Sequence, residues 1–236
     1  ASASDNVGVV GVQFKLDTAN LGSEDTATPY SLSWNTTTTA NGSHTLTAVA
    51  RDAAGNKTTS SPVVVTVSNS TTQLSTFNPV ADAHVRGGTF ASQNFGTANV
   101  LEEKNSNLDS YDRRTFLRFD LSSITSTSAT SATLRLYVSS LVEGTAPITV
   151  FAVTSDSWTE TGITWSNQPA FGSQLVSQTL STTGWASFNV TSFVNSQLAG
   201  DKKVSLMLWD TTQAIKLVQF NSRENSLNKP VLEVTR

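Results

Sequence analysis

One stretch decides the fold, Arg113-Arg114-Thr115-Phe116-Leu117-Arg118-Phe119-Asp120-Leu121. Successive side chains of a β-strand point to opposite faces of the sheet, so this stretch would have two faces of different character. The first face carries Thr115, Leu117, Phe119 and Leu121, and the second carries Arg114, Phe116, Arg118 and Asp120. We therefore expect a strand with one face in the core and one face that carries mainly charged side chains, called here the decorated face. Phe116 lies on the decorated face but is expected to be buried.

A second alternating stretch follows at residues 131–138, with Ala132, Leu134, Leu136 and Val138 on one face and Thr133, Arg135 and Tyr137 on the other. Further strands are expected near residues 80–86, 99–104, 148–153, 184–190, 204–210, 215–221 and 230–235. One helix is expected at residues 191–199, capped by Thr191 and ended by Gly200. Nine or ten strands with one short helix predict a jelly-roll β-sandwich.

The first third of the chain has shorter strand patterns. Residues 11–16 and 43–50 alternate, Val63–Val67 is an apolar run, and Asn41-Gly42 and Ala54-Gly55-Asn56 are typical of turns. Short strands at this spacing predict an antiparallel sandwich. Residues 69–73 lack core side chains and a new strand pattern starts near Leu74, so we place the domain boundary near residue 72, giving domains 1–72 and 73–236.

The composition excludes several classes of protein. Among 236 residues there is no cysteine, which rules out disulfides, a thiolate nucleophile and a cysteine-ligated metal. The net charge of −3 argues against nucleic-acid binding, and no apolar run approaches the roughly 20 residues that span a membrane. Because the only methionine is Met207, we expect the chain to have been cut from a longer precursor. We expect a monomer without nucleic-acid or membrane partners.

The N-terminal segment has three motifs, Ala3-Ser4-Asp5-Asn6-Val7-Gly8, Gly42-Ser43-His44-Thr45-Leu46 and Ala50-Arg51-Asp52-Ala53-Ala54-Gly55-Asn56. Through them it resembles bacterial immunoglobulin-like domains over residues 1–68. Such domains normally have one or two strands before the first motif, so we expect a truncated sandwich with an exposed sheet edge. The resemblance implies a spacer in a secreted multidomain protein.

The larger segment has a series of blocks in one order: Ala81-Asp82-Ala83, Asn94-Phe95-Gly96-Thr97, residues 116–122, 131–137, 158–169, 188–191 and 220–224. It resembles the family named for an Asp-Asn-Arg-Leu-Arg-Glu-type signature, which overlaps carbohydrate-binding module family 96. The resemblance implies a bacterial β-sandwich, secreted or at the cell surface, attached to polysaccharide-degrading or surface domains of its parent chain. It also implies alginate as the ligand class, although one fold hosts many functions.

Basic residues dominate the decorated side of the predicted sheet. Guanidinium groups present a planar fork of donors that suits the carboxylates of an acidic glycan. We expect Arg114, Arg118 and Arg135 to lie together, with Tyr137 stacking on a sugar ring. The other candidates for a basic groove are Lys104, Arg113, His84 and Arg86.

Two simpler interpretations remain open. The arginines would instead form ordinary surface pairs with Asp82, Glu102, Asp112 and Asp120. Among the aromatic residues, the segment from Trp158 to Pro169 has the polar character of a structured loop, so we interpret it as architecture. Trp185 and Trp209 have no motif of their own, and core is the commoner place for such residues.

A structural calcium ion is a further expectation, because jelly-roll carbohydrate modules often hold one and hard cations prefer oxygen ligands. The candidate ligands are Asp82, Asn94 and Glu224, since the first and last strands of a sandwich commonly lie close together. The alternative is that Glu224 pairs with Arg223 and that Asp82 caps a turn.

Catalysis has little support in the sequence. His44 and His84 fall in different domains, and no Gly-x-Ser-x-Gly elbow or spaced carboxylate pair is present. We therefore predict a non-catalytic module that binds an acidic glycan such as alginate and targets a larger secreted protein to it. The alternatives are a structural or adhesive surface segment and, with less support, a polysaccharide lyase using Tyr137 and Arg135.

Overall fold

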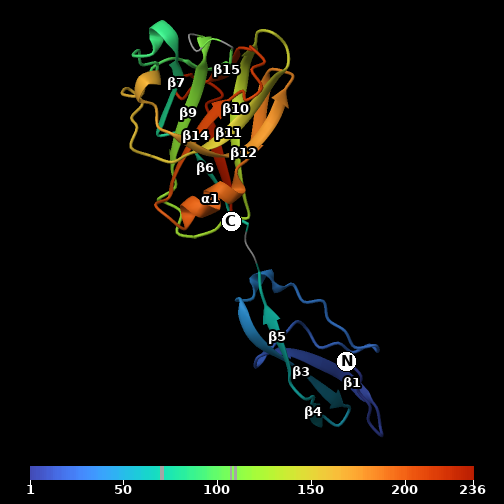
Figure 1. Ribbon diagram of the computed structural model, residues 1–236. Helices are drawn as coiled ribbons and strands as arrows, with labels where there is room; N and C mark the ends of the chain where they lie inside the picture. The colour runs from blue at the N-terminus through green and yellow to red at the C-terminus, as the bar shows by residue number, and fades with distance from the viewer. Residues whose placement is uncertain (70–71, 107, 109–110) are drawn as a thin grey trace. The chain divides into compact units, whose positions relative to one another are not determined.

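The computed structural model describes residues 1–69, 72–106, 108 and 111–236. The chain divides into two compact units, Ala1–Thr71 and Thr72–Arg236 (Figure 1). Residues 70 and 71 of the predicted boundary segment lie outside the described residues. No helix in the described part of the chain is both long and apolar enough to cross a membrane.

The first unit is built on one antiparallel sheet. Its strands are β1 (Val9–Leu16), β2 (Ala19–Asn20), β3 (Gly42–Asp52), β4 (Lys57–Thr59) and β5 (Val63–Val67), and one short 3-10 helix, η1, covers Thr36–Thr38. β3 is central, because β1 pairs along one edge while β4 and β5 pair with different halves of β3. The predicted turn at Ala54-Gly55-Asn56 is present, with the Gly55 N–H donating to the Asp52 carbonyl, whereas Asn41 lies at a bend and Gly42 begins β3. Gly42 and Gly55 have φ values of 140° and 91°, which favour glycine.

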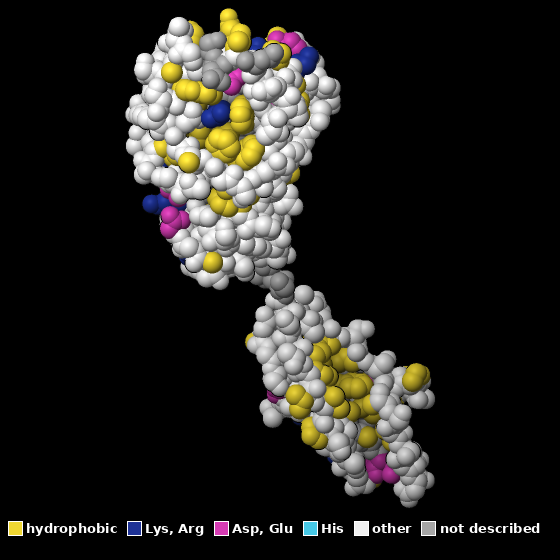
Figure 2. Space-filling view, in the orientation of Figure 1, with side chains coloured by type: hydrophobic (Ala, Val, Ile, Leu, Met, Phe, Trp, Pro, Cys, Tyr) yellow, Lys and Arg dark blue, Asp and Glu magenta, His cyan; other side chains and the backbone are white. Residues whose placement is uncertain are grey.

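The core of this first unit is thin. Its buried hydrophobic side chains are Val12, Tyr30 and Val67, whereas Val64 on β5 is 68% exposed. Figure 2 shows hydrophobic side chains gathered on the visible face of this unit. Part of the sheet therefore keeps apolar surface in contact with water.

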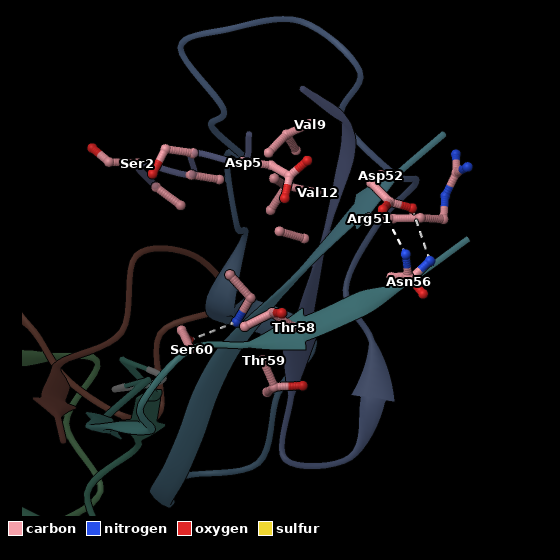
Figure 3. A pocket seen from close by; sticks show the side chains of 15 residues that line it. Ser2, Asp5, Val9, Val12, Arg51, Asp52, Asn56, Thr58, Thr59 and Ser60 are labelled. Carbon is pink, nitrogen blue, oxygen red and sulfur yellow. Dashed lines mark hydrogen bonds between the residues drawn. The ribbon is translucent and has the colours of Figure 1, made fainter. Parts of the chain in front are cut away.

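A hollow of about 310 Å³ lies against β1, β3 and β4 of the first unit (Figure 3). The charged side chains on its wall already have partners. Arg51 forms a fork-like pair with Glu24, and the Asp52 carboxylate accepts the backbone and side-chain N–H groups of Asn56. We therefore interpret the hollow as architecture.

The second unit contains two sheets, each of which is named here after one of its strands. The β10 sheet contains β6 (Leu74–Phe77), β16 (Val231–Thr235), β10 (Ser131–Leu141), β15 (Val218–Asn221), β8 (Val100–Glu103) and β13 (Gly184–Asn189). The β9 sheet contains β12 (Phe171–Leu180), β11 (Ala146–Val153), β14 (Lys203–Trp209), β9 (Arg113–Asp120) and β7 (Ala81–Arg86). All of these strand pairs are antiparallel.

The main core lies between the two sheets, as the alternating residues predict. β9 contributes Leu117 and Phe119, and β10 contributes Ala132, Leu134, Leu136 and Val138, all buried. The predicted β-sandwich with one short helix is confirmed. That helix, α1 (Thr191–Leu198), buries Val194 and Leu198 in the same core.

The cap of α1 differs from the prediction. Thr191 is the first helical residue, and its backbone N–H donates to Asn189 Oδ1 at 3.0 Å. Asn189 Oδ1 thus satisfies the N–H of the first helical residue, whereas a capping threonine would accept an N–H two or three residues further along the helix.

A second hydrophobic cluster covers the outer face of the β9 sheet. The long connection between β11 and β12, residues 154–170, folds over this face and contains the 3-10 helix η4 (Trp165–Asn167). The cluster consists of Ala81, Ala83, Val85, Phe116, Phe151, Val153, Trp158, Ile163 and Met207. The burial expected for Phe116 is confirmed, and the decorated face of β9 is covered by protein.

In the second unit, one strand escaped prediction. β12 reads Phe-Gly-Ser-Gln-Leu-Val-Ser-Gln-Thr-Leu, in which Ser and Gln obscure the alternation. It lies at the edge of its sheet, where one partner suffices, and its pairing with β11 contains two register shifts. An edge strand needs less apolar patterning than a central one, so its signal was weak.

Candidate functional site

The residues of the predicted basic face do not lie together. Two groups of them are on different sheets, and the remaining candidates lie around Glu102. Arg114 and Arg118 lie on β9, whose paired neighbours are β14 and β7. Arg135 and Tyr137 lie on β10, which belongs to the other sheet. The expectation that Arg135 would lie beside Arg114 and Arg118 is therefore wrong, because strands close in sequence joined different layers of the sandwich.

Arg118 holds the 154–170 loop. Its Nη1 donates to the carbonyl of Asp156 at 2.6 Å and also to the carbonyl of Trp158, and its guanidinium lies 5.3 Å from the Trp158 ring centre. Such charge-assisted bonds to backbone oxygens are among the stronger ones in proteins. The geometry gives Arg118 a structural task.

Arg114 lies in an aromatic cage on the same face. Its guanidinium carbon is 4.1 Å from the ring centre of Trp209 and 4.6 Å from that of Trp165, and Nη1 donates to Gln168 Oε1 at 3.1 Å. Cation–π contacts of this kind hold arginine and aromatic rings together. Arg114 thus joins β9 and β14 to the loop.

Four more candidates, His84, Arg86, Arg113 and Lys104, lie near one edge of the sandwich around Glu102. Arg113 Nη1 is 3.3 Å from Glu102 Oε2, which is one of the acidic pairings that the simpler interpretation expected. The Arg86 guanidinium lies 4.2 Å from the Phe90 ring centre. The Lys104 backbone bridges to Arg113, and its side chain lines a separate hollow with Tyr111.

His84 is buried and stacks on Phe95, with ring centres 4.7 Å apart. Burial lowers the pKa of His84 to about 4. The nearby Glu102 opposes this shift, whereas the positive charge of Arg86 adds to it. Its Nε2 is 3.7 Å from Glu102 Oε2, so near pH 7 a neutral imidazole faces a carboxylate. This residue cannot supply the positive charge that a glycan carboxylate needs.

A pH dependence follows from His84. Its folded pKa lies below its usual 6.5, so the unfolded chain binds more protons between pH 6.5 and 4. The free energy of unfolding should therefore decrease as the pH is lowered from 6.5 to 4, and His84 should account for roughly 3 kcal/mol of that decrease. Thermal unfolding of the full chain and of His84→Gln between pH 4 and 7 measures the difference, and parallel curves would contradict it.

The most exposed aromatic residue on a sheet face is Trp185 of β13. It is 42% exposed, pairs in register with Tyr137 of β10, and meets that ring edge to face at 5.6 Å between centres. The Arg135 guanidinium lies 4.8 Å from the Trp185 ring centre and pairs with Glu233 at 2.8 Å. We call Trp185, Tyr137 and Arg135, with Glu233, the Trp185 face.

The expectation that Trp185 belongs to the core is wrong. Its neighbours Ala186 and Phe188 are buried in the main core, so the period of two directs Trp185 to the outer face. That alternation was present in the sequence and could have found the site. The outer face offers a flat ring with one basic and one acidic group beside it.

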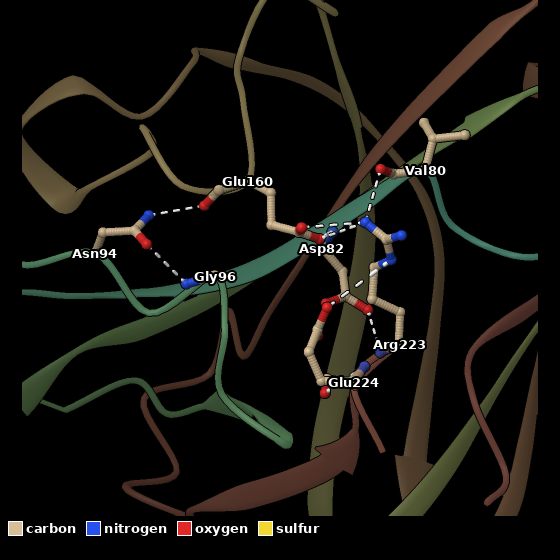
Figure 4. A network of polar contacts seen from close by, with 8 residues as sticks. Val80, Asp82, Asn94, Gly96, Glu160, Arg223 and Glu224 are labelled. Atoms are coloured by element: carbon tan, nitrogen blue, oxygen red, sulfur yellow. Dashed lines mark hydrogen bonds and ion pairs between the residues drawn. The ribbon is translucent and has the colours of Figure 1, made fainter. Parts of the chain in front are cut away.

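A group of three carboxylates lies at a different place in the unit (Figure 4). Asp82 on β7, Glu160 in the 154–170 loop and Glu224 after β15 each offer an oxygen within 4.8 Å of the others. Arg223 binds this acidic cluster, because its Nη1 donates to Glu160 Oε1 at 3.0 Å and its backbone N–H donates to Asp82 Oδ2 at 2.8 Å. The expected pairing of Glu224 with Arg223 is present at 3.9 Å.

Asp82 is 1% exposed, and burial raises its pKa to about 8, with Glu224 and Glu160 acting in the same direction. Its Oδ1 is buried without a hydrogen-bond partner among the described residues, and the same holds for Glu224 Oε2. Buried charge without compensation is costly. The cluster therefore provides two free oxygen acceptors that the described protein atoms do not satisfy.

Asn94, the third predicted ligand, serves the backbone instead. Its Nδ2 donates to the carbonyls of Glu160 and Ile163, both at 2.7 Å, and its Oδ1 accepts the Gly96 N–H. The side chain is thus used to fix the loop that carries Glu160. Glu160 was missed because nothing in its spacing relates it to Asp82, 78 residues earlier.

Comparisons with known proteins agree with this architecture. The carbohydrate-binding module family 96 matches residues 73–236, and the bacterial Ig domain family matches residues 1–48. A gellan lyase from a Bacillus species is 30% identical over 129 residues, which are 52% of this chain and 5% of the lyase. The chain thus spans about a twentieth of that relative.

One similar solved structure concerns the promiscuous specificity of carbohydrate-binding modules from the β-sandwich superfamily. The match covers 98% of this chain and 84% of that chain, at 12% identity and a TM-score of 0.22. So low a TM-score supports no argument about ligand or site.

Proposed function

Since this chain belongs to carbohydrate-binding module family 96 through residues 73–236, we propose that its Trp185 face binds an acidic polysaccharide without chemical conversion. The observation that carries the proposal is the exposed Trp185 ring beside Tyr137 and Arg135. An aromatic ring can stack on the C–H face of a sugar, and the indole buries a large apolar area when it does so.

Arg135 supplies the charge in this proposal. Its guanidinium is about one-third exposed and has one carboxylate partner, Glu233, leaving donors for a ligand carboxylate. The pair is at the surface, where such bridges are worth little and are easily rearranged. Arg135 can therefore bind a uronate while the ring of Trp185 holds the sugar.

This chemistry and the family support the proposed ligand class. We propose alginate or a similar uronate-bearing glycan, and gellan joins the test because a gellan lyase is a partial relative. In a secreted parent protein, the module would direct catalytic or surface domains to the polysaccharide, with the immunoglobulin-like unit as spacer. Weak binding per monomeric site would gain avidity from repeated modules.

Affinity electrophoresis of the full chain against alginate, gellan, pectin, chitosan and a neutral glucan tests the proposal. We expect retardation by an acidic glycan, weakened by salt. Trp185→Ala should reduce the affinity roughly tenfold or more, as for a central aromatic contact. The matched control is Tyr111→Ala, another aromatic residue, 57% exposed and distant in sequence, which should bind as the unchanged chain does.

Three results would contradict parts of this picture. Equal retardation of Trp185→Ala and the unchanged chain would place the site elsewhere, and retardation lost only in Tyr111→Ala would place it near the Lys104 hollow. No retardation by any glycan would favour a structural or adhesive role. New absorbance from unsaturated uronates would indicate a lyase.

A further inference from the structure

We propose that Asp82, Glu160 and Glu224 bind one calcium ion, which joins β7, the 154–170 loop and the segment after β15. The three side chains come from parts of the chain that are far apart in sequence, and their oxygens lie within 4.8 Å of one another (Figure 4). Calcium binds oxygens at 2.3–2.6 Å, so oxygens on opposite sides of one ion lie about 5 Å apart. The proposal is independent of glycan binding.

Charge counting supports a dication. Around a bound metal ion all three carboxylates would be ionised, so the cluster would have three negative charges and Arg223 one positive charge, leaving −2. Arg223 alone thus does not neutralise the site, and buried charges in proteins are normally paired or bound to metal. One calcium ion would neutralise the remainder.

The free oxygens point to the same conclusion. Asp82 is 1% exposed and belongs to the cluster, yet its Oδ1 has no hydrogen-bond partner among the described residues. Glu224 Oε2 is in the same situation. A cation bound to both oxygens would compensate their buried negative charge.

Calcium fits better than magnesium. Magnesium usually keeps several waters and takes only one or two carboxylates, whereas calcium accepts six to eight oxygen ligands in flexible geometry. Three carboxylates leave room for carbonyl or water oxygens around calcium. The competing possibility is a proton on Asp82, which would remove one negative charge without any metal.

The surrounding bonds show why the site would matter. The Asp82 N–H donates to Glu160 Oε1 at 3.0 Å, and Asn94 fixes the Glu160 carbonyl. These contacts bring the loop to β7, beside the cluster formed by Trp158 and Ile163. A calcium ion at this point would stabilise the loop and the second hydrophobic cluster together.

Thermal unfolding and calorimetric calcium titration of the full chain test the proposal after removal of metals with EDTA. We expect one calcium ion bound per chain and a midpoint of unfolding several degrees higher with calcium than with EDTA, and a smaller effect of magnesium. Glu160→Gln and Glu224→Gln should each reduce calcium affinity at least tenfold, because each removes a charged ligand. Asp120→Asn is the control, as an exposed carboxylate outside the cluster.

The absence of calcium binding and of any calcium-dependent shift in the unchanged chain would overturn the proposal. Asp82→Asn separates the two explanations further: if Asp82 holds a proton, the variant should unfold at the same midpoint near pH 7, and calcium should affect neither protein. If Asp82→Asn does not fold, the calorimetric result for the unchanged chain and for Glu224→Gln decides the question.

Discussion

Gly96→Ala is expected to destabilise residues 72–236 by about 3 kcal/mol, which is a large fraction of the stability of an ordinary domain. A Cβ at this position would lie 2.0 Å from the Glu160 carbonyl oxygen and 2.6 Å from its carbon. Both atoms are backbone, so neither can swing aside as a flexible side chain would. The close approach explains the glycine of the Asn94-Phe95-Gly96 motif.

The neighbouring contacts make the displacement costly. The Glu160 carbonyl accepts the Asn94 Nδ2 at 2.7 Å, and moving it would also move the carboxylate of the acidic cluster. Thermal unfolding should show a midpoint roughly 10 °C lower. Gly200→Ala is the matched control, because its Cβ would meet nothing closer than 3.4 Å. Equal midpoints for the two variants would contradict the steric explanation.

Arg118→Ala is expected to lower the free energy of unfolding by about 2–4 kcal/mol while leaving glycan affinity unchanged. The variant removes the donor to the Asp156 and Trp158 carbonyls and the cover over the Trp158 ring. The 154–170 loop would then lose its attachment to β9 near Trp158, while Arg114 would still hold the loop at Gln168. Chemical unfolding measures the stability, and electrophoresis well below the unfolding midpoint measures the binding.

Arg135→Ala provides the opposite result. Its pair with Glu233 is about one-third exposed, so the stability should change by about 1 kcal/mol or less. Its retardation by an acidic glycan should weaken, whereas binding to a neutral glycan should not. Reduced glycan affinity in Arg118→Ala with unchanged affinity in Arg135→Ala would reverse our assignment of the two arginines.

Period-two patterns predicted the architecture of the second unit well. The alternation in β9 and β10 identified which residues form the core, since burial of one face leaves that signal in the sequence. The same patterns could not tell which sheet each strand joins. That choice separated Arg135 from Arg114 and Arg118, because it depends on long-range pairing with β13, β14, β15 and β16.

The candidate sites were predictable in part. Asp82 and Glu224 were named from the expected proximity of the first and last strands, and the structure brings them together. Glu160 joins them from a loop whose path no local pattern specifies. Trp185 was missed for a different reason. Its alternation with the core residues Ala186 and Phe188 was present in the sequence, but we expected it to be buried because tryptophan more often lies in the core.

The pairing of β6 with β16 has a consequence for synthesis of the protein. These strands form an antiparallel pair although more than 150 residues separate Phe77 from Leu232. A ribosome adds about 5–20 residues per second, so β6 waits roughly 8–30 s for its only strand partner in the described sheet. During that time its backbone donors and Phe77 are open to other chains, and this interval is when a chaperone would protect the nascent protein most effectively.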